Sequence, residues 1–306
     1  MIKVVNIRVR SFDLSYLDLY WDLESSFEDV NDYQFIVEAS DAEFGKYFQI
    51  ADPIVNVFHF RDTTVRGQHS FYHERWYRIR VRYREVSKQT ADGESTDRLY
   101  PSQGGVCLAA RPDLPALEMA RIHRLKLKEF QGRKIWVYAK RRFGQRCSVC
   151  FDPVTQRKLR ADCSSCFGAG YVGGYHAPVE CYGMIITPDE ATAHPQFGTV
   201  ETENTMIMLA NYPDITSGDM IVEAENVRWR VGSRITKIKK ARALVRQQAP
   251  LHRIPEGDIE YTIPLNLTSA QVKDLTASPE RNYTNPHTLE SANLPGYLKD
   301  VFGTDL

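Results

Sequence analysis

The sequence predicts a mainly β protein built from several domains. Its 306 residues exceed the usual size of one domain. Sixteen tyrosines and fourteen phenylalanines favour strands over helices. Apolar and polar residues alternate in many short segments that turn residues separate, which is the pattern of half-buried strands. We expect one helix only, at residues 113–130.

Membrane and export signals are missing from the sequence. No run approaches the roughly 20 apolar residues that cross a bilayer. The first residues mix apolar and charged side chains, whereas a signal peptide needs a continuous apolar core. We therefore expect a protein that is made and assembled in a cytoplasm, with no membrane among its partners.

Residues 1–86 are expected to form a β-sandwich. The apolar residues of the segment 17–23 share one parity, as a half-buried strand requires. Several strands at such short spacing are typical of two packed antiparallel sheets. Further strands are expected at 35–39, 44–50, 54–60 and 76–83.

The last of these strands carries a stripe of arginines. Its apolar residues face one way and its arginines face the other, with a clean period of two. We interpret the stripe as a solvated strand face, and a ladder for phosphate groups is the less favoured alternative. The stripe consists of Arg78, Arg80, Arg82 and Arg84.

The same region resembles a fibronectin type III domain. The resemblance rests on residues 19–22, 32–37 and 76–81. In that family a tryptophan of an early strand packs in the core, and a tyrosine near the start of the penultimate strand makes a corner contact. The resemblance gives these roles to Trp21 and Tyr77. It implies a domain that binds, spaces or decorates, and that is rarely catalytic.

Residues 87–131 are expected to hold a linker and then the helix. Residues 87–111 are polar and contain glycine, as extended linkers do. Asp113 is a good N-cap, Pro115 is tolerated in the first turn, and Gly132 would end the helix. The second half of the helix is basic, which we interpret as a solvated face or as a wall against nucleic acid.

Two Cys-x-x-Cys pairs lie within residues 132–178. Two such knuckles place four sulfur atoms around one tetrahedral metal ion. Nine lysines and arginines against two acidic residues offset the charge of four thiolates and one zinc ion. We therefore predict a structural zinc ribbon at 132–178. Its ligands would be Cys147, Cys150, Cys163 and Cys166.

Other uses of these cysteines fit the sequence less well. Two disulfides would need an oxidising compartment, and a redox pair would need only one Cys-x-x-Cys. Nothing suggests the electron transfer of an iron–sulfur cluster. A catalytic zinc is not expected, because four cysteines leave no coordination position for water. The remaining cysteines, Cys107 and Cys181, are expected to be single thiols.

Catalytic signatures are missing as well. The sequence has no Gly-x-x-x-x-Gly-Lys-Ser/Thr, no Gly-x-Ser-x-Gly and no His-Glu-x-x-His. His176 is isolated and is interpreted as a packing or surface residue, and strand alternation explains Asp219 and its neighbouring acids. We predict no catalytic residues, no cofactor other than structural zinc, and no enzymatic activity.

Residues 179–264 are expected to form a small β-barrel, and residues 265–306 an extended tail. The segment 235–246 would be one long basic strand. The tail has few apolar clusters, so we expect it to become ordered only against a neighbour. The candidate strands of the barrel are 179–187, 205–210, 219–224, 227–232, 235–246 and 259–263, with a turn at Glu225 and Asn226.

The formal charge is zero overall but unevenly distributed. Residues 1–60 carry four lysines and arginines against eleven acidic residues, a net charge of −7, whereas residues 132–178 carry nine against two, a net charge of +7. Such a chain has either two solvated faces or two surfaces for different partners.

The second half of the chain resembles neck proteins of tailed bacteriophages. Residues 173–185 are similar to zinc-loop phage structural proteins, and residues 217–231 with the basic segment after them are similar to head-closure (stopper) proteins. In that family a small β-barrel is built from strands that flank a Gly-Asp turn, and the barrels form rings on the portal axis. The resemblance implies a ring-forming structural virion protein, a head–tail connector that closes the portal channel.

The resemblance also implies partners and a location. We expect other copies in a ring of about six or twelve, the portal or adaptor and tail terminator proteins, and the packaged DNA as a further contact. The protein would lie in the virion neck after assembly in the host cytoplasm. The competing class is a zinc-ribbon nucleic-acid-binding protein, because the zinc region is basic with interleaved aromatic residues. An enzyme accessory subunit is a third class.

Overall fold

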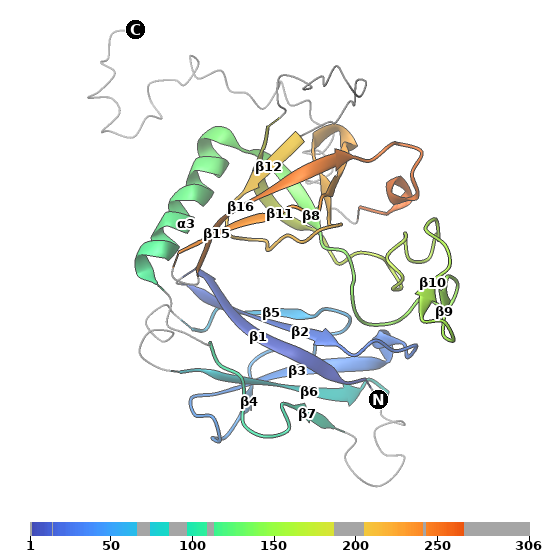
Figure 1. The fold of residues 1–306 in the computed structure, drawn as a ribbon. Coiled ribbons are helices and arrows are strands. Elements are labelled where there is room, and N and C mark those ends of the chain that lie inside the picture. Colours follow the sequence, from blue (N-terminus) through green and yellow to red (C-terminus); the bar gives the residue numbers. More distant parts are fainter. Residues whose placement is uncertain are drawn as a thin grey trace, which may run out of the picture.

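The described residues form two β bodies, with one α-helix and one cysteine-rich segment beside them (Figure 1). The computed structural model describes residues 2–13, 15–65, 74–85, 97–108, 113–186, 205–240 and 243–265. The prediction of a mainly β fold is confirmed. The lower body in Figure 1 is a two-sheet sandwich, and the upper body is a closed barrel that α3 flanks.

The first body is a sandwich of a three-stranded and a four-stranded antiparallel sheet. Residues of one parity fill the space between the sheets, with Trp21, Phe35 and Tyr77 fully buried among them. The three-stranded sheet has the order β1 (Val4–Asp13), β2 (Tyr16–Leu23), β5 (His59–Asp62). The other has the order β4 (Phe48–Gln49), β3 (Tyr33–Ser40), β6 (Trp76–Tyr83), β7 (Arg98–Tyr100), and a 3₁₀ turn, η1 (Val30–Asp32), precedes β3.

Two predicted strands of the sandwich were placed wrongly. The segment 44–50 is strand only at β4, because a turn closed by the bond from Gly45 N to Ala42 O precedes it. The segment 54–60 does not form one strand, since Asn56 has a left-handed φ of 53° that interrupts the extended backbone. Ile54 forms an isolated bridge with Phe35, and the strand starts at His59.

The sandwich continues beyond residue 86, where the sequence suggested a linker. β7 pairs with β6 through Ile79 and Tyr100, and Val106 makes a two-way backbone bridge with Tyr77. Leu108 packs against the same core. Polar composition therefore hid a strand that belongs to the first body, because an edge strand needs few apolar residues.

The arginine stripe lies on the outward face, as expected, but carboxylates pair with three of its four arginines. Arg78 and Arg80 both pair with Glu38 of the neighbouring strand, and Arg82 pairs with Asp97 at 2.6 Å. Glu38 is only 3% exposed. Because the guanidinium groups already hold carboxylates, the stripe is a set of cross-strand ion pairs and not a phosphate ladder.

The second body is a closed six-stranded β-barrel. Long β16 closes it by pairing with β14 through its last residues and with β12 on its other side. Ile135, Ile207 and Ile221 lie fully buried in its interior. The order is β12 (Thr205–Leu209), β11 (Val179–Ile186), β8 (Arg133–Tyr138), β13 (Met220–Val222), β14 (Arg228–Val231), β16 (Ala243–Arg253), with β15 (Thr236–Lys240) also on β16 and a 3₁₀ turn, η3 (Ala224–Asn226), between β13 and β14.

Three predictions about the barrel need correction. Its limits are not 179–264, because β8 is one of its strands. The segment 235–246 is not one strand, because the chain reverses between Lys240 and Ala243 and the two halves pair as a hairpin. The segment 259–263 is a 3₁₀ helix, η4 (Ile259–Thr262), which turns Glu260 into the protein interior.

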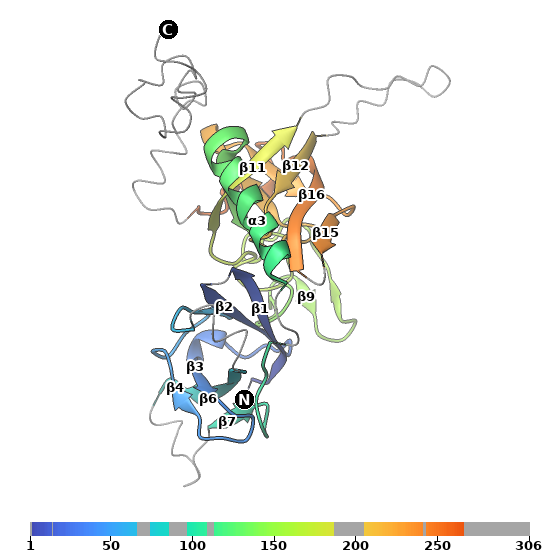
Figure 2. The same cartoon turned by 90° about the vertical axis from the view of Figure 1, so that its left-hand side faces the viewer.

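The predicted helix is present as α3 (Leu114–Lys126), followed by one π turn, η2 (Leu127–Gln131). The π turn ends where Gly132 N donates to Leu127 O at 2.8 Å. A Cβ on Gly132 would lie 2.4 Å from that same oxygen, so only glycine fits. Asp113 precedes the helix but makes no side-chain capping bond. Figure 2 shows α3 lying across the barrel strands.

The predicted tail, residues 265–306, lies outside the described residues except for Leu265, which packs on the outer face of the barrel. Within the described part of the chain, no helix is long and apolar enough to cross a membrane.

Candidate metal centre

The cysteine-rich segment is an insertion between two neighbouring strands of the barrel. β8 and β11 pair directly, with Val137 opposite Val179. Residues 139–178 leave the barrel after the first strand and return to it at the second. The zinc ribbon predicted at 132–178 thus shares its first residues with the barrel.

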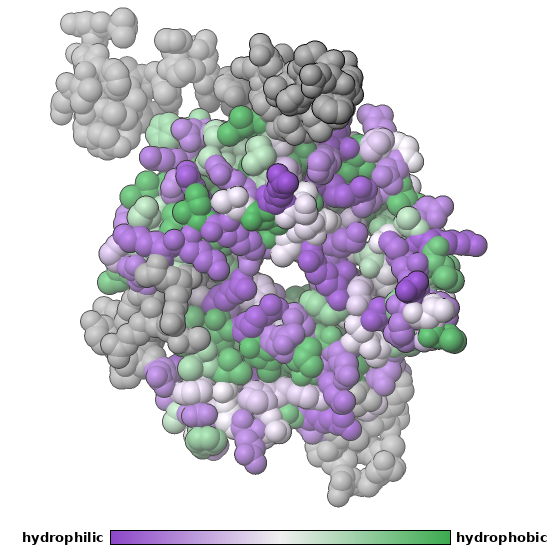
Figure 3. Space-filling view, viewed as in Figure 1, coloured by the Kyte–Doolittle hydropathy of each residue, from purple (hydrophilic) through white to green (hydrophobic). Residues whose placement is uncertain are grey.

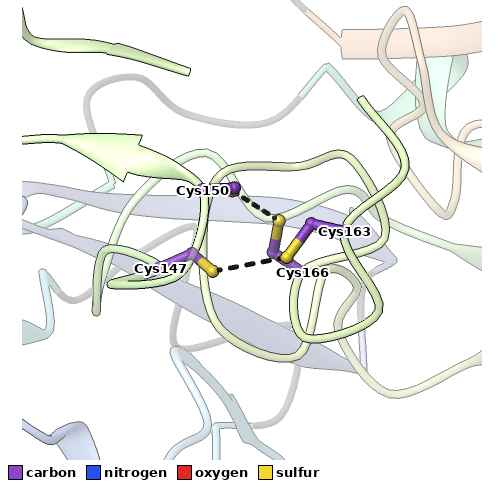
Figure 4. Close-up of side chains that lie close together, drawn as sticks. All are labelled: Cys147, Cys150, Cys163 and Cys166. Atoms are coloured by element: carbon purple, nitrogen blue, oxygen red, sulfur yellow. Dashed lines mark hydrogen bonds between the residues drawn. The ribbon is translucent and has the colours of Figure 1, made fainter. Parts of the chain in front are cut away.

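Two tight turns bring the four predicted ligands together. In the first knuckle Phe151 N donates to Cys147 O at 3.1 Å, and in the second Phe167 N donates to Cys163 O at 2.7 Å. The four sulfur atoms of Cys147, Cys150, Cys163 and Cys166 lie within 4.8 Å of one another, and all four residues are buried (Figure 4).

The sulfur–sulfur distances fit a metal centre better than disulfides. The distance from Cys147 Sγ to Cys163 Sγ is 3.8 Å, and that from Cys150 Sγ to Cys166 Sγ is 3.2 Å. A disulfide needs about 2.05 Å, and all four cysteines are free thiols. Four thiolates around zinc at about 2.3 Å would lie about 3.8 Å apart. The centre therefore has the donor set and the size to bind one metal ion.

Local backbone geometry explains why glycines follow the second knuckle. Gly174 has a left-handed φ of 67°, and a Cβ there would lie 2.8 Å from Cys166 O. Gly168, at φ 71°, would place a Cβ 2.6 Å from Ala161 O. Glycine at these positions lets the chain fold back over the sulfur atoms.

The electrostatic environment differs among the sulfur atoms. Burial raises the pKa of Cys147, but hydrogen bonds from the backbone N–H groups of Val149 and Cys150 outweigh it and bring the pKa to about 7. Burial and the neighbouring Cys166 raise the pKa of Cys150. Backbone donors of the first knuckle thus favour a thiolate, the form that binds a metal ion.

The metal unit, residues 139–178, is attached to the sandwich. Arg146 N donates to Ser26 O at 2.7 Å, and Tyr171 and Ser25 share a hydroxyl hydrogen bond of 3.0 Å. The rings of Phe143 and Phe58 pack edge to face, with centroids 5.1 Å apart. The folded metal unit therefore also stabilises one side of the sandwich.

The same unit is attached to the barrel through two buried carboxylates that the sequence reasoning did not select. Asp219 accepts from Lys140 N at 3.0 Å and from Thr216 N at 2.7 Å. Glu260 accepts from Tyr175 Oη at 2.9 Å and pairs with Arg230 at 2.6 Å. Burial raises the pKa of Asp219, against the hydrogen bonds that it accepts. The metal unit is thus a strut between the two bodies.

The other singled-out residues lie away from this centre. Cys107 and Cys181 are free and half-buried. His176 is a packing residue, as expected, but at a defined joint. Its ring lies 5.8 Å from that of Phe58 in the sandwich and 5.6 Å from that of Phe143 in the metal unit.

We expect the joint at His176 to weaken in acid. Burial, and then Arg141, lower its pKa from 6.5 to about 4. The neutral ring therefore contributes stability that is complete above pH 6.5 and is lost as the pH falls from 6.5 to 4. Denaturant unfolding should show a loss of about 2 kcal/mol between pH 7 and pH 5 from this residue. The variant His176→Phe should not show this loss of stability between pH 7 and pH 5.

The measurement needs constant zinc content, since acid also protonates thiolates. Both proteins are therefore unfolded with excess zinc and with metal analysis at each pH. An equal pH dependence in the wild type and His176→Phe would contradict the assignment.

A scan of the chain against protein-family models and a search of curated protein sequences found no match.

Proposed function

We propose that this chain is a structural virion protein of a tailed bacteriophage, a ring-forming neck protein that closes the portal channel and joins head to tail. The observation that carries the proposal is the small closed barrel. The neck-protein resemblance implies a barrel built from strands that flank a Gly-Asp turn. Gly218 and Asp219 form such a turn, which leads into β13 and then β14.

The metal is proposed to be zinc in a structural role. Four cysteine thiolates are a donor set that zinc accepts in tetrahedral geometry. Because they fill its coordination sphere, no position remains for a reacting water. Among the described residues these cysteines are the one group that could hold a metal ion. We assign the chain no catalytic role.

The first body is proposed to be a fibronectin type III module. Its two sheets of three and four strands and its buried Trp21 support this assignment. Tyr77, the proposed corner tyrosine, donates its hydroxyl to Asp62 Oδ2 at 2.8 Å. In this proposal the barrel forms the ring, and the fibronectin-like module contacts a neighbouring protein of the neck.

Location and mass test the proposed function. The purified protein is expected to form a closed ring of about six or twelve copies in native mass spectrometry and negative-stain images. In purified virions, labelling should mark the junction of head and tail. Labelling of the capsid shell or the tail fibres, or its absence from virions, would refute the connector assignment.

The alternative, a zinc-ribbon nucleic-acid-binding protein, has one supporting observation. The hairpin of β9 (Phe151–Asp152) and β10 (Arg157–Lys158) projects from the metal unit (Figure 1), and Arg157 and Arg160 on it are exposed. They have no carboxylate partner in the described part of the chain. A monomer or dimer that binds DNA in a strongly salt-dependent manner would favour this alternative over the ring.

A further inference from the structure

Helix α3 is apolar on two opposite sides. Ala116, Leu117 and Ala120 are buried on the side that packs on β16. The opposite side carries Met119, Ile122 and Leu125, each more than 40% exposed. The exposed ion pair of Glu118 and Arg121 lies among these apolar residues. We call the exposed residues Leu114, Met119, Ile122 and Leu125 of α3, together with Phe130 of the π turn that follows it, the outer face of α3.

The outer face gathers exposed apolar residues in one short stretch of the chain. Five of the fifteen exposed large hydrophobic residues of the described chain lie on it. Figure 3 shows hydrophobic residues mixed with hydrophilic ones over the position of α3. Exposed apolar patches of this kind mark interaction sites. A nucleic acid backbone has no apolar counterpart for such a patch.

Unpaired cations border the outer face. Lys240 Nζ lies 3.9 Å from Met119 Sδ. Lys126 lies on α3 itself, one turn after Ile122, and Arg246 lies on β16, which contacts the helix. Lys126, Lys240 and Arg246 form no ion pair with any described carboxylate. The partner of this surface should therefore be apolar and acidic.

Residues 290–306, in the part that the structure does not describe, are a segment of such a composition. Its apolar residues follow the spacing of one helix face, i, i+3, i+4, i+7 and i+8. It carries three acidic residues and one lysine, a net charge of −2. The spaced apolar residues are Leu294, Tyr297, Leu298, Val301 and Phe302.

We infer that residues 290–306 of a neighbouring copy dock on the outer face of α3. The inference rests on the proposed ring and gives it a mechanism. Residues 266–289 span up to about 80 Å when extended, which is enough to reach a neighbour. The two surfaces differ, so the contact is heterologous, and repeated heterologous contacts close into a ring.

Two variants of the full chain test the contact, one on each surface. Ile122→Glu places an acid on the outer face, and Val301→Asp places one in the docking segment. Each alone should lose the large assembly, with self-association weakened about 100-fold, because a carboxylate at the centre of an apolar contact must give up its hydration there. Native mass spectrometry measures the masses.

A mixture of the two variants is the decisive sample. Ile122→Glu still offers an intact docking segment, and Val301→Asp still offers an intact outer face. Together they should form heterodimers, which have one working contact, but no ring. Circular dichroism should match the wild type, because Ile122 is exposed; Leu125→Glu serves as a second outer-face variant.

The matched control is Phe44→Asp, which changes an exposed apolar residue of the sandwich and should keep the assembly. If both variants still assemble, this inference is wrong and the proposed ring still stands. The same result is expected if the segment docks on α3 of its own chain. A wild-type protein that is monomeric would overturn the inference and the proposed ring together.

Discussion

Replacing Cys163 by serine should release the metal ion and unfold residues 139–178. The metal unit has little apolar core besides its four buried cysteines, so its folding depends on metal binding. Structural zinc contributes about 10 kcal/mol or more to such units. Metal analysis should find one zinc ion per wild-type chain and none in the variant. Hydrogen exchange should show loss of protection in 139–178.

The two β bodies should survive this change, because each has its own core. Their mutual position should loosen on one side, since the metal unit joins Ser26 of the sandwich to Asp219 and Glu260 of the barrel. The direct contacts between the two bodies, such as Asn211 Nδ2 donating to Phe12 O at 2.8 Å, should remain. Cys107→Ser is the matched control and should keep the metal ion. Wild-type protein without zinc, or with disulfides among these cysteines, would disprove the metal assignment.

The features predicted correctly from the sequence are those that depend on local spacing. Two Cys-x-x-Cys pairs predicted which four cysteines lie together, because each knuckle closes within a few residues. The parity of Leu17, Leu19 and Trp21 fixes which side of β2 is buried. The helix was found because Asp113 and Gly132 bracket it, although the closing π turn was not foreseen.

The features that were missed depend on contacts between distant residues. Nothing in the sequence near β8 indicates that it pairs with β13, so the predicted barrel, which began at residue 179, left β8 out. Glu260 meets Tyr175 across 85 positions, and this buried contact holds the segment as a 3₁₀ turn, not a strand. Likewise, Glu38 of β3 and Asp97, next to β7, pair with arginines of the stripe, which no local pattern reveals.

Substitution of Asp18 should have the second large effect on stability. Asp18 is a fully buried acid and belongs to a group of contacting residues that joins the two bodies. It accepts hydrogen bonds from Arg61 Nε at 2.8 Å and from His59 Nε2 at 2.9 Å. The Arg61 guanidinium in turn lies over two rings, 3.9 Å from that of Tyr16 and 4.9 Å from that of Tyr212. Tyr212 belongs to the barrel segment, so Asp18 orients a contact between sandwich and barrel.

Asp18→Asn should destabilise the protein by about 2–4 kcal/mol. Removing one partner of a buried pair costs about 3–5 kcal/mol, and the partial exposure of Arg61 reduces that loss. The control is Arg8→Ala, which breaks the exposed pair with Asp22 and should cost less than about 1 kcal/mol. Denaturant unfolding measures both changes.

A double variant separates the lost pair from a general loss of packing. If Asp18 acts through Arg61, then Asp18→Asn combined with Arg61→Leu should cost less than the sum of the single changes, by about 1–3 kcal/mol. Hydrogen exchange around Tyr212 should rise in each single variant, because Arg61 no longer holds the contact with the barrel. Additive costs with unchanged exchange there would show that Asp18 stabilises the sandwich alone and does not couple the two bodies.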